Sequence, residues 1–141
     1  MGVDVGTVRV GVAISDPHGI LATPLGTFPR DARAGSDLAR LAALVAEHAV
    51  VEVVVGLPRS LSGREGAAVA AARDYGDQLQ RRIHPVPIRW VDERLTSVTA
   101  NRILAERGIK AKKARAIVDQ VAAVQILQVY LDGSRGRGAG G

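Results

Sequence analysis

Four acidic residues lie in or beside segments that are otherwise apolar, and they are the first candidates for chemistry. They are Asp4 in the opening apolar run, Asp92 and Glu93 directly after the apolar run 88–91, and Asp119 in a helical pattern. A buried carboxylate is costly unless a positive group meets it. A metal ion, a cation bound to phosphate or an arginine could supply that charge.

Three of these acids have a simpler explanation. Asp4 could close the turn at Gly6-Thr7 by hydrogen bonding. Neighbouring strand residues point to opposite faces, so at most one of Asp92 and Glu93 can share a site with Asp4, and the pattern does not select which. Both could instead favour the start of the following helix through their negative charge.

Asp119 is the most informative of the four. On a helix its face also carries small and apolar residues suited to lying on a sheet, namely Ala122, Ala123, Ile126 and Tyr130. An ion pair with Arg115, one turn earlier, is the simpler explanation and would contribute ~0.3 kcal/mol. A carboxylate on the packing face of a helix nevertheless favours a functional role.

Convergence of three such acids would create a site for hard divalent cations. Carboxylate oxygens in a chain without cysteine favour Mg²⁺ or Mn²⁺. None of the histidines, which are His18, His48 and His84, has the spacing of a metal ligand. Two ions held by shared carboxylates can activate water and stabilise the leaving oxygen in phosphodiester hydrolysis.

The hydrophobic pattern predicts the elements that must position these acids. Apolar residues alternate with small or polar ones over 8–15, which predicts a strand that forms a hairpin with residues 1–5. A third strand is expected over 20–28, after a turn at 16–19. A helix from Asp37 to His48 follows, then a buried strand over 50–55 and a loop over 56–63. The next helix has a capping box of Ser62 and Glu65 and ends near 83. A strand over 88–91 and helices over 97–107 and 112–131 complete the predicted elements.

This order predicts an α/β fold, with a mixed sheet and helices on its faces. The 141 residues are expected to form one domain over 1–131, and the Gly/Arg-rich tail over 132–141 is expected to be disordered. No apolar run approaches the ~20 residues that cross a bilayer, and no signal peptide opens the chain. The absence of cysteine is compatible with a reducing cytoplasm. The net charge of +5 favours a polyanionic partner, nucleic acid first.

Four short motifs are spread along nearly the whole chain. In order they are Asp4-Val-Gly-Thr7 with Val10-Gly-Val-Ala13, then Val54-Val-Gly-Leu-Pro58 with Ser62-Gly63 and Glu65-Gly66, then Asp92-Glu-Arg-Leu-Thr-Ser97, and last Val118-Asp-Gln-Val-Ala-Ala123 with Ile126-Leu127. Together they resemble the YqgF (RuvX) family, whose members are described as pre-16S rRNA nucleases and as Holliday-junction resolvases. The resemblance implies a ribonuclease H-like fold: a five-stranded mixed sheet, its first three strands antiparallel, with helices on both faces.

The resemblance also implies roles for particular residues. Asp4, Glu93 and Asp119 would be the catalytic carboxylates and would bind Mg²⁺ or Mn²⁺, expected as two ions; Glu93 is chosen over Asp92 by analogy only. Basic residues would contact the nucleic-acid backbone, and the candidates are Arg9, Arg59, Arg64, Arg94, Lys112 and Arg115. For Arg64 and Lys112, ordinary solvated charge remains the favoured explanation. Family members usually carry several residues before the first strand, whereas three precede Asp4 here, so a shortened first strand is expected.

The function implied by the resemblance is that of a metal-dependent endonuclease, with 5′-end processing of precursor 16S rRNA first and cleavage of branched DNA as the alternative. A lobe of an actin-like ATPase or sugar kinase would also use Asp-x-Gly-Thr, but a second such phosphate loop is not found. A non-catalytic nucleic-acid-binding module would not need three acids, and a base-stacking platform would need more aromatics than one Trp, two Tyr and one Phe. Monomer and dimer both stay open.

Overall fold

The computed structural model describes residues 1–58, 66–93 and 121–133 of the chain. In chain order the elements are β1 (Gly2–Val5), β2 (Arg9–Ser15), β3 (Ala22–Pro29), α1 (Ser36–Glu47), β4 (Val53–Leu57), α2 (Gly66–Ile83) and β5 (Ile88–Asp92). A further helix spans residues 121–133. In this part of the chain, no helix combines the length and the apolar character needed to cross a membrane.

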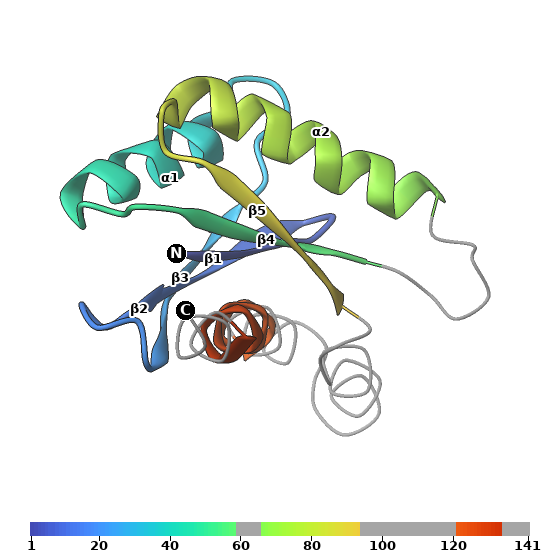
Figure 1. The fold of residues 1–141 in the computed structure, drawn as a ribbon. Coiled ribbons are helices and arrows are strands. Elements are labelled where there is room, and N and C mark those ends of the chain that lie inside the picture. The colour runs from blue at the N-terminus through green and yellow to red at the C-terminus, as the bar shows by residue number, and fades with distance from the viewer. Residues whose placement is uncertain (59–65, 94–120, 134–141) are drawn as a thin grey trace.

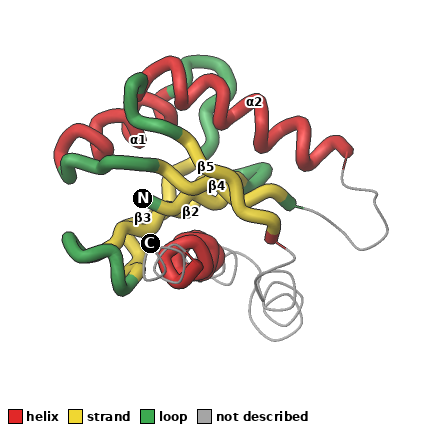
Figure 2. Tube along the Cα trace, in the orientation of Figure 1, coloured by secondary structure: helices red, strands yellow, loops and turns green. Residues whose placement is uncertain are grey.

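The five strands form one mixed sheet in the order β3-β2-β1-β4-β5. β1 pairs antiparallel with β2 and β2 with β3, whereas β4 lies parallel to both β1 and β5. Helices α1 and α2 cover one face of the sheet, and helix 121–133 lies against the other (Figure 1). Figure 2 shows the same layers, with the strands between α1 and α2 on one side and helix 121–133 on the other. The expected fold class is therefore confirmed.

Alternation along β2 divides its side chains between the two layers. Val10 and Val12 are fully buried in the core formed with α1 and α2. Ala13 packs in a second core, beneath helix 121–133. The apolar stripe of α1 faces the first core, as its three-four spacing predicts, and consists of Leu38, Leu41, Leu44 and Val45.

The predicted position of the buried fourth strand was wrong by several residues. The strand spans Val53–Leu57, not 50–55, and Val51 is 81% exposed. The reason is the position of its neighbours. The Val53 N–H donates to the Pro87 carbonyl at 3.0 Å, and the Val54 N–H donates to the Met1 carbonyl at 2.8 Å. Pairing thus begins where β1 and β5 begin, and Gly56 lies inside the strand instead of in a loop.

Helix 121–133 packs very close to the backbone of the sheet. A Cβ atom on Gly2 would lie 2.7 Å from Leu127 Cβ and 2.8 Å from the Ala123 carbonyl oxygen. The predicted small and apolar stripe does face the sheet, since Ala122, Ala123 and Ile126 are buried there. The helix continues to residue 133, two residues beyond the boundary expected from the sequence. The capping box at 62 and 65, the helix over 97–107, residues 112–120 and the tail from 134 lie outside the described residues.

Candidate active site

Asp4 lies in the centre of the sheet, on the face covered by helix 121–133. It is 1% exposed and is paired across the antiparallel ladder with Gly11 of β2. Val3 belongs to the core under α1 and α2, whereas Gly2 meets helix 121–133. Because strand residues alternate between faces, Asp4 shares the face of Gly2. The chain thus places a carboxylate between two packed layers.

Glu93 follows β5 directly and is 4% exposed. Its Oε1 atom lies 3.0 Å from the position that a Cβ atom on Gly56 would take. The same position lies 2.5 Å from Ile126 Cδ1, which belongs to helix 121–133. The Glu93 carboxylate therefore lies over the backbone of β4, beneath that helix.

The two carboxylates lie on one face, around Gly56. β1 and β4 are parallel, with Val3 opposite Val55, so the next residue along each strand brings Asp4 beside Gly56. Glu93 reaches the same glycine from β5. Asp92 pairs with Leu57 and is half-buried, and alternation turns it away from the face of Glu93. The sequence pattern left these two acids equivalent; the structure places Glu93 on the Asp4 face.

Arg9 is the one predicted phosphate contact within the described residues. It is half-buried on β2 and, by alternation with the core residue Val10, lies on the Asp4 face. Its Nη1 atom is buried, and the described part of the chain gives that atom no hydrogen-bond acceptor. The other predicted residues, Asp119, Arg59, Arg64, Arg94, Lys112 and Arg115, lie outside the described residues.

The donor set suits a hard divalent cation. Asp4 and Glu93 contribute carboxylate oxygens, the ligands that Mg²⁺ and Mn²⁺ prefer. Among residues 1–58, 66–93 and 121–133, no group of three acidic, histidine or cysteine side chains could hold a metal ion. Two of the three predicted acids thus lie on one face, and Asp119 lies outside the described residues.

Sequence reasoning missed two features that shape the site. The sequence pattern predicts Gly56 in a loop, although a glycine that follows three valines is also one sign of close approach to the backbone of a strand. Asp37 was treated as an ordinary residue at a helix start, but it is 4% exposed and pairs with Arg30. No local pattern indicates that burial, because it depends on packing between α1 and α2.

Comparison with known proteins identifies the family. A sequence profile described as "RuvX: Holliday junction resolvase" matches residues 1–133. The chain belongs to the RuvX family. The relatives of this RuvX chain include a protein of Frankia casuarinae, 57% identical over 141 residues, which are all of this chain and 70% of the relative. A protein of Mycobacterium ulcerans is 56% identical over 135 residues, or 96% of this chain and 79% of the relative. Both are named "Putative pre-16S rRNA nuclease".

A solved structure supports the fold independently of the sequence. RuvC of T. thermophilus, in complex with a Holliday junction substrate, aligns with a TM-score of 0.57. The alignment covers 96% of the RuvX chain and 94% of RuvC, at 17% sequence identity. At that identity the likeness shows a shared fold, in agreement with the ribonuclease H-like architecture that the motifs implied.

Proposed function

We propose that this RuvX chain is a divalent-metal-dependent endonuclease that hydrolyses phosphodiester bonds in structured nucleic acid. The observation that carries the proposal is the placement of Asp4 and Glu93, two buried carboxylates, on one face around Gly56. The name shared by the relatives from Frankia and Mycobacterium supports processing of the 5′ end of precursor 16S rRNA as the reaction. The cytoplasm, where that RNA is made, is the proposed location.

The proposed ligands are Asp4, Glu93 and Asp119, which would hold two Mg²⁺ or Mn²⁺ ions. Such ions, when bound, would activate the attacking water and stabilise the leaving oxygen. Asp4, Glu93 and Asp119 would supply the carboxylate oxygens that hold these ions. Helix 121–133 covers this face of the sheet and so limits the access of bulk water to Asp4 and Glu93, which strengthens electrostatic attraction there.

The net charge of +5 supports a nucleic-acid substrate, because cationic side chains neutralise phosphates. The half-buried Arg9 is proposed to contact the backbone of the substrate near the scissile phosphate. Arg59, Arg94, Lys112 and Arg115 are proposed as further backbone contacts. A dimer would be compatible with a branched substrate.

The decisive experiment is cleavage of labelled precursor 16S rRNA with Mn²⁺ by the parent and by Asp4→Asn. Glu47→Gln is the matched control, because it neutralises an exposed carboxylate at the end of α1. We expect the parent and the control to cleave, and Asp4→Asn to lose at least about a hundredfold in rate. Equal cleavage by parent and Asp4→Asn would refute the mechanism.

Cleavage of branched DNA is the second candidate, because the family profile describes a Holliday junction resolvase. A four-way junction assayed beside the rRNA precursor separates the two reactions. Preference for the junction would replace the first substrate with the second and leave the roles of the carboxylates intact. No cleavage of either substrate by the parent would refute the proposed activity.

A further inference from the structure

Arg30 joins the layer of α1 and α2 to the turn that follows Asp4. The residue comes directly after β3, and its backbone N–H donates to the Val8 carbonyl at 2.8 Å. Its side-chain Nη1 donates to the Gly6 carbonyl at 2.7 Å. One residue therefore holds the β1–β2 turn at two carbonyl groups, and the second of these bonds depends on the guanidinium.

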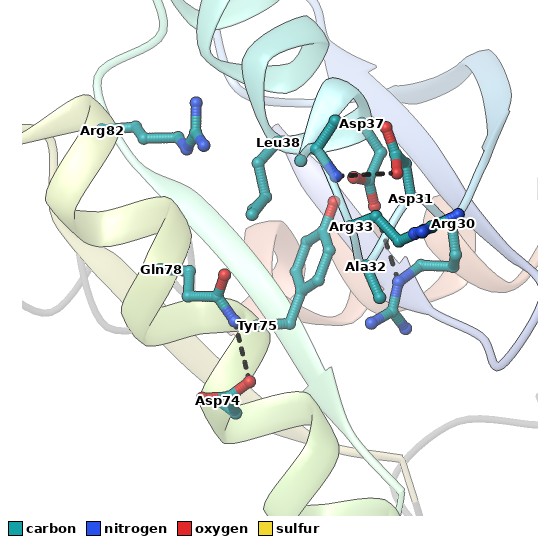
Figure 3. Close-up of a pocket in the computed structure, with 12 residues that line it drawn as sticks. Arg30, Asp31, Ala32, Arg33, Asp37, Leu38, Asp74, Tyr75, Gln78 and Arg82 are labelled. Atoms are coloured by element: carbon teal, nitrogen blue, oxygen red, sulfur yellow. Dashed lines mark hydrogen bonds and ion pairs between the residues drawn. The ribbon is translucent and has the colours of Figure 1, made fainter.

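The guanidinium is itself held in place by two buried side chains. Arg30 Nε lies 3.5 Å from Asp37 Oδ2, and the Asp37 side chain is only 2% exposed. Arg30 Cζ lies 4.8 Å from the centre of the Tyr75 ring, a distance typical of a cation–π contact. Burial and then the Asp37 carboxylate raise the pKa of the Tyr75 hydroxyl, which therefore stays neutral. Figure 3 shows that hydroxyl directed toward Asp37.

The arrangement gives Arg30 little freedom to move. It lines a hollow of about 310 Å³ between the segment before α1 and helix α2, and its side chain is 25% exposed. A buried carboxylate such as Asp37 needs a positive partner, so the ion pair restrains the guanidinium on that side. A planar guanidinium can keep that pair while it donates to Gly6 in a fixed direction.

We propose that Arg30 is a positioning residue: it fixes the turn after β1 and thereby the orientation of Asp4 for metal binding. Gly6 follows Asp4 by two residues, and its own N–H donates to the Arg9 carbonyl at 3.0 Å. Metal ligands must be held within a few tenths of an ångström, so a looser turn weakens the site without removing a ligand. The inference rests on the proposed metal-dependent function, because it assigns Asp4 as a ligand.

The test compares Arg30→Met with Arg40→Met. Both substitutions remove one positive charge and an arginine that covers an aromatic ring, since Arg40 Cζ lies 5.7 Å from the Phe28 ring centre. Mn²⁺ binding is measured by calorimetry on the full chain, and hydrogen exchange is followed at residues 6–9. We expect about tenfold weaker Mn²⁺ binding and faster exchange of the turn for Arg30→Met. Arg40→Met should match the parent in both measurements.

The double variant Arg30→Met/Asp37→Asn separates positioning from stability. It removes the buried charge that Arg30→Met leaves unpaired, so its Tm should recover toward that of the parent. Mn²⁺ binding should stay weak, because the donor to Gly6 is still missing. Recovery of both quantities, or equal Mn²⁺ binding by Arg30→Met and Arg40→Met, would overturn the role of Arg30. A parent that binds no Mn²⁺ would instead refute the metal site itself, and with it this role.

Discussion

The Glu93 carboxylate lies over Gly56: Glu93 Oε1 is 3.0 Å from the position that a Cβ atom on that glycine would take. Ile126 Cδ1 is 2.5 Å from the same position. Cβ atoms essentially never lie 2.5 Å from a carbon of a distant residue, so a side chain here must displace Ile126 and press on the Glu93 carboxylate. Because Gly56 has no side chain, the Glu93 carboxylate and helix 121–133 can meet over β4, the strand next to Asp4.

Gly56→Ala is expected to weaken Mn²⁺ binding by about tenfold and to lower the free energy of unfolding by about 1–3 kcal/mol, because the added methyl overpacks the core and moves Glu93. Calorimetry and urea denaturation measure the two effects. Gly2→Ala is the matched control. Its Cβ atom would meet the same helix at Leu127 and Ala123, without touching Glu93. We expect a loss of stability at least as large, with Mn²⁺ binding less affected than in Gly56→Ala. Equally weakened Mn²⁺ binding in the two variants would contradict the role of Gly56.

Glu93→Gln is expected to remove the stabilisation that metal gives the folded protein. Saturation at a hundred times Kd contributes roughly 2.7 kcal/mol to the parent, which corresponds to a rise in Tm of about 5–10 °C. Thermal unfolding with Mn²⁺ and with a chelator measures that rise. Asp92→Asn is the control, because it neutralises the adjacent half-buried acid and should keep the full rise. A rise as large in Glu93→Gln as in the parent would exclude Glu93 as a ligand.

Local sequence patterns sufficed for much of the fold. The alternation over 8–15 predicted β2, and the composition of residues 16–19 predicted the turn, where the Gly19 N–H donates to the Asp16 carbonyl at 3.0 Å. The stripe that begins with Leu38 predicted which side of α1 is buried. These predictions are confirmed because each feature depends only on residues that are near one another in the sequence.

The arrangement of the candidate site depends on pairing between distant segments, which no local pattern contains. Val50 and Val51 are the same residue type as the three valines that open β4, yet the hydrogen bonds to Met1 and Pro87 start the strand at Val53. That register places Gly56 beside Asp4 and under Glu93. The preference for Glu93 over Asp92 came from family resemblance, and its placement on the Asp4 face follows only from the register of β5 on β4.

Asp31→Ala is expected to make stability less dependent on pH in acid. Hydrogen bonds from the Ser36 hydroxyl and from the Ala34 and Ser36 amides lower the pKa of Asp31 from 3.8 to about 2. A lowered folded pKa means that the ionised group stabilises the fold above pH 3.8, and that this contribution disappears as the pH falls toward 2. Parent and variant should therefore differ in Tm at pH 7 and converge near pH 2.

The control for Asp31 is Asp77→Ala, which removes an exposed acid from α2. Its Tm should differ little from that of the parent at pH 7. A difference between parent and Asp31→Ala that persists unchanged to pH 2 would show that the carboxylate charge does not hold the segment before α1.

Gln128→Leu is expected to loosen the contact between helix 121–133 and the β2–β3 hairpin. Gln128 Oε1 accepts from the Ala22 N–H, and Nε2 donates to the Ile20 carbonyl, both at 2.9 Å. Leucine leaves the Ala22 N–H unsatisfied, which costs about 1–3 kcal/mol in the free energy of unfolding. Gln78→Leu is the control. The Gln78 side-chain Nε2 donates a hydrogen bond to Asp74 within α2, so we expect its loss to change the free energy of unfolding by less than about 0.5 kcal/mol. Urea denaturation of both variants measures the difference, and equal values would mean that the hairpin does not anchor the helix.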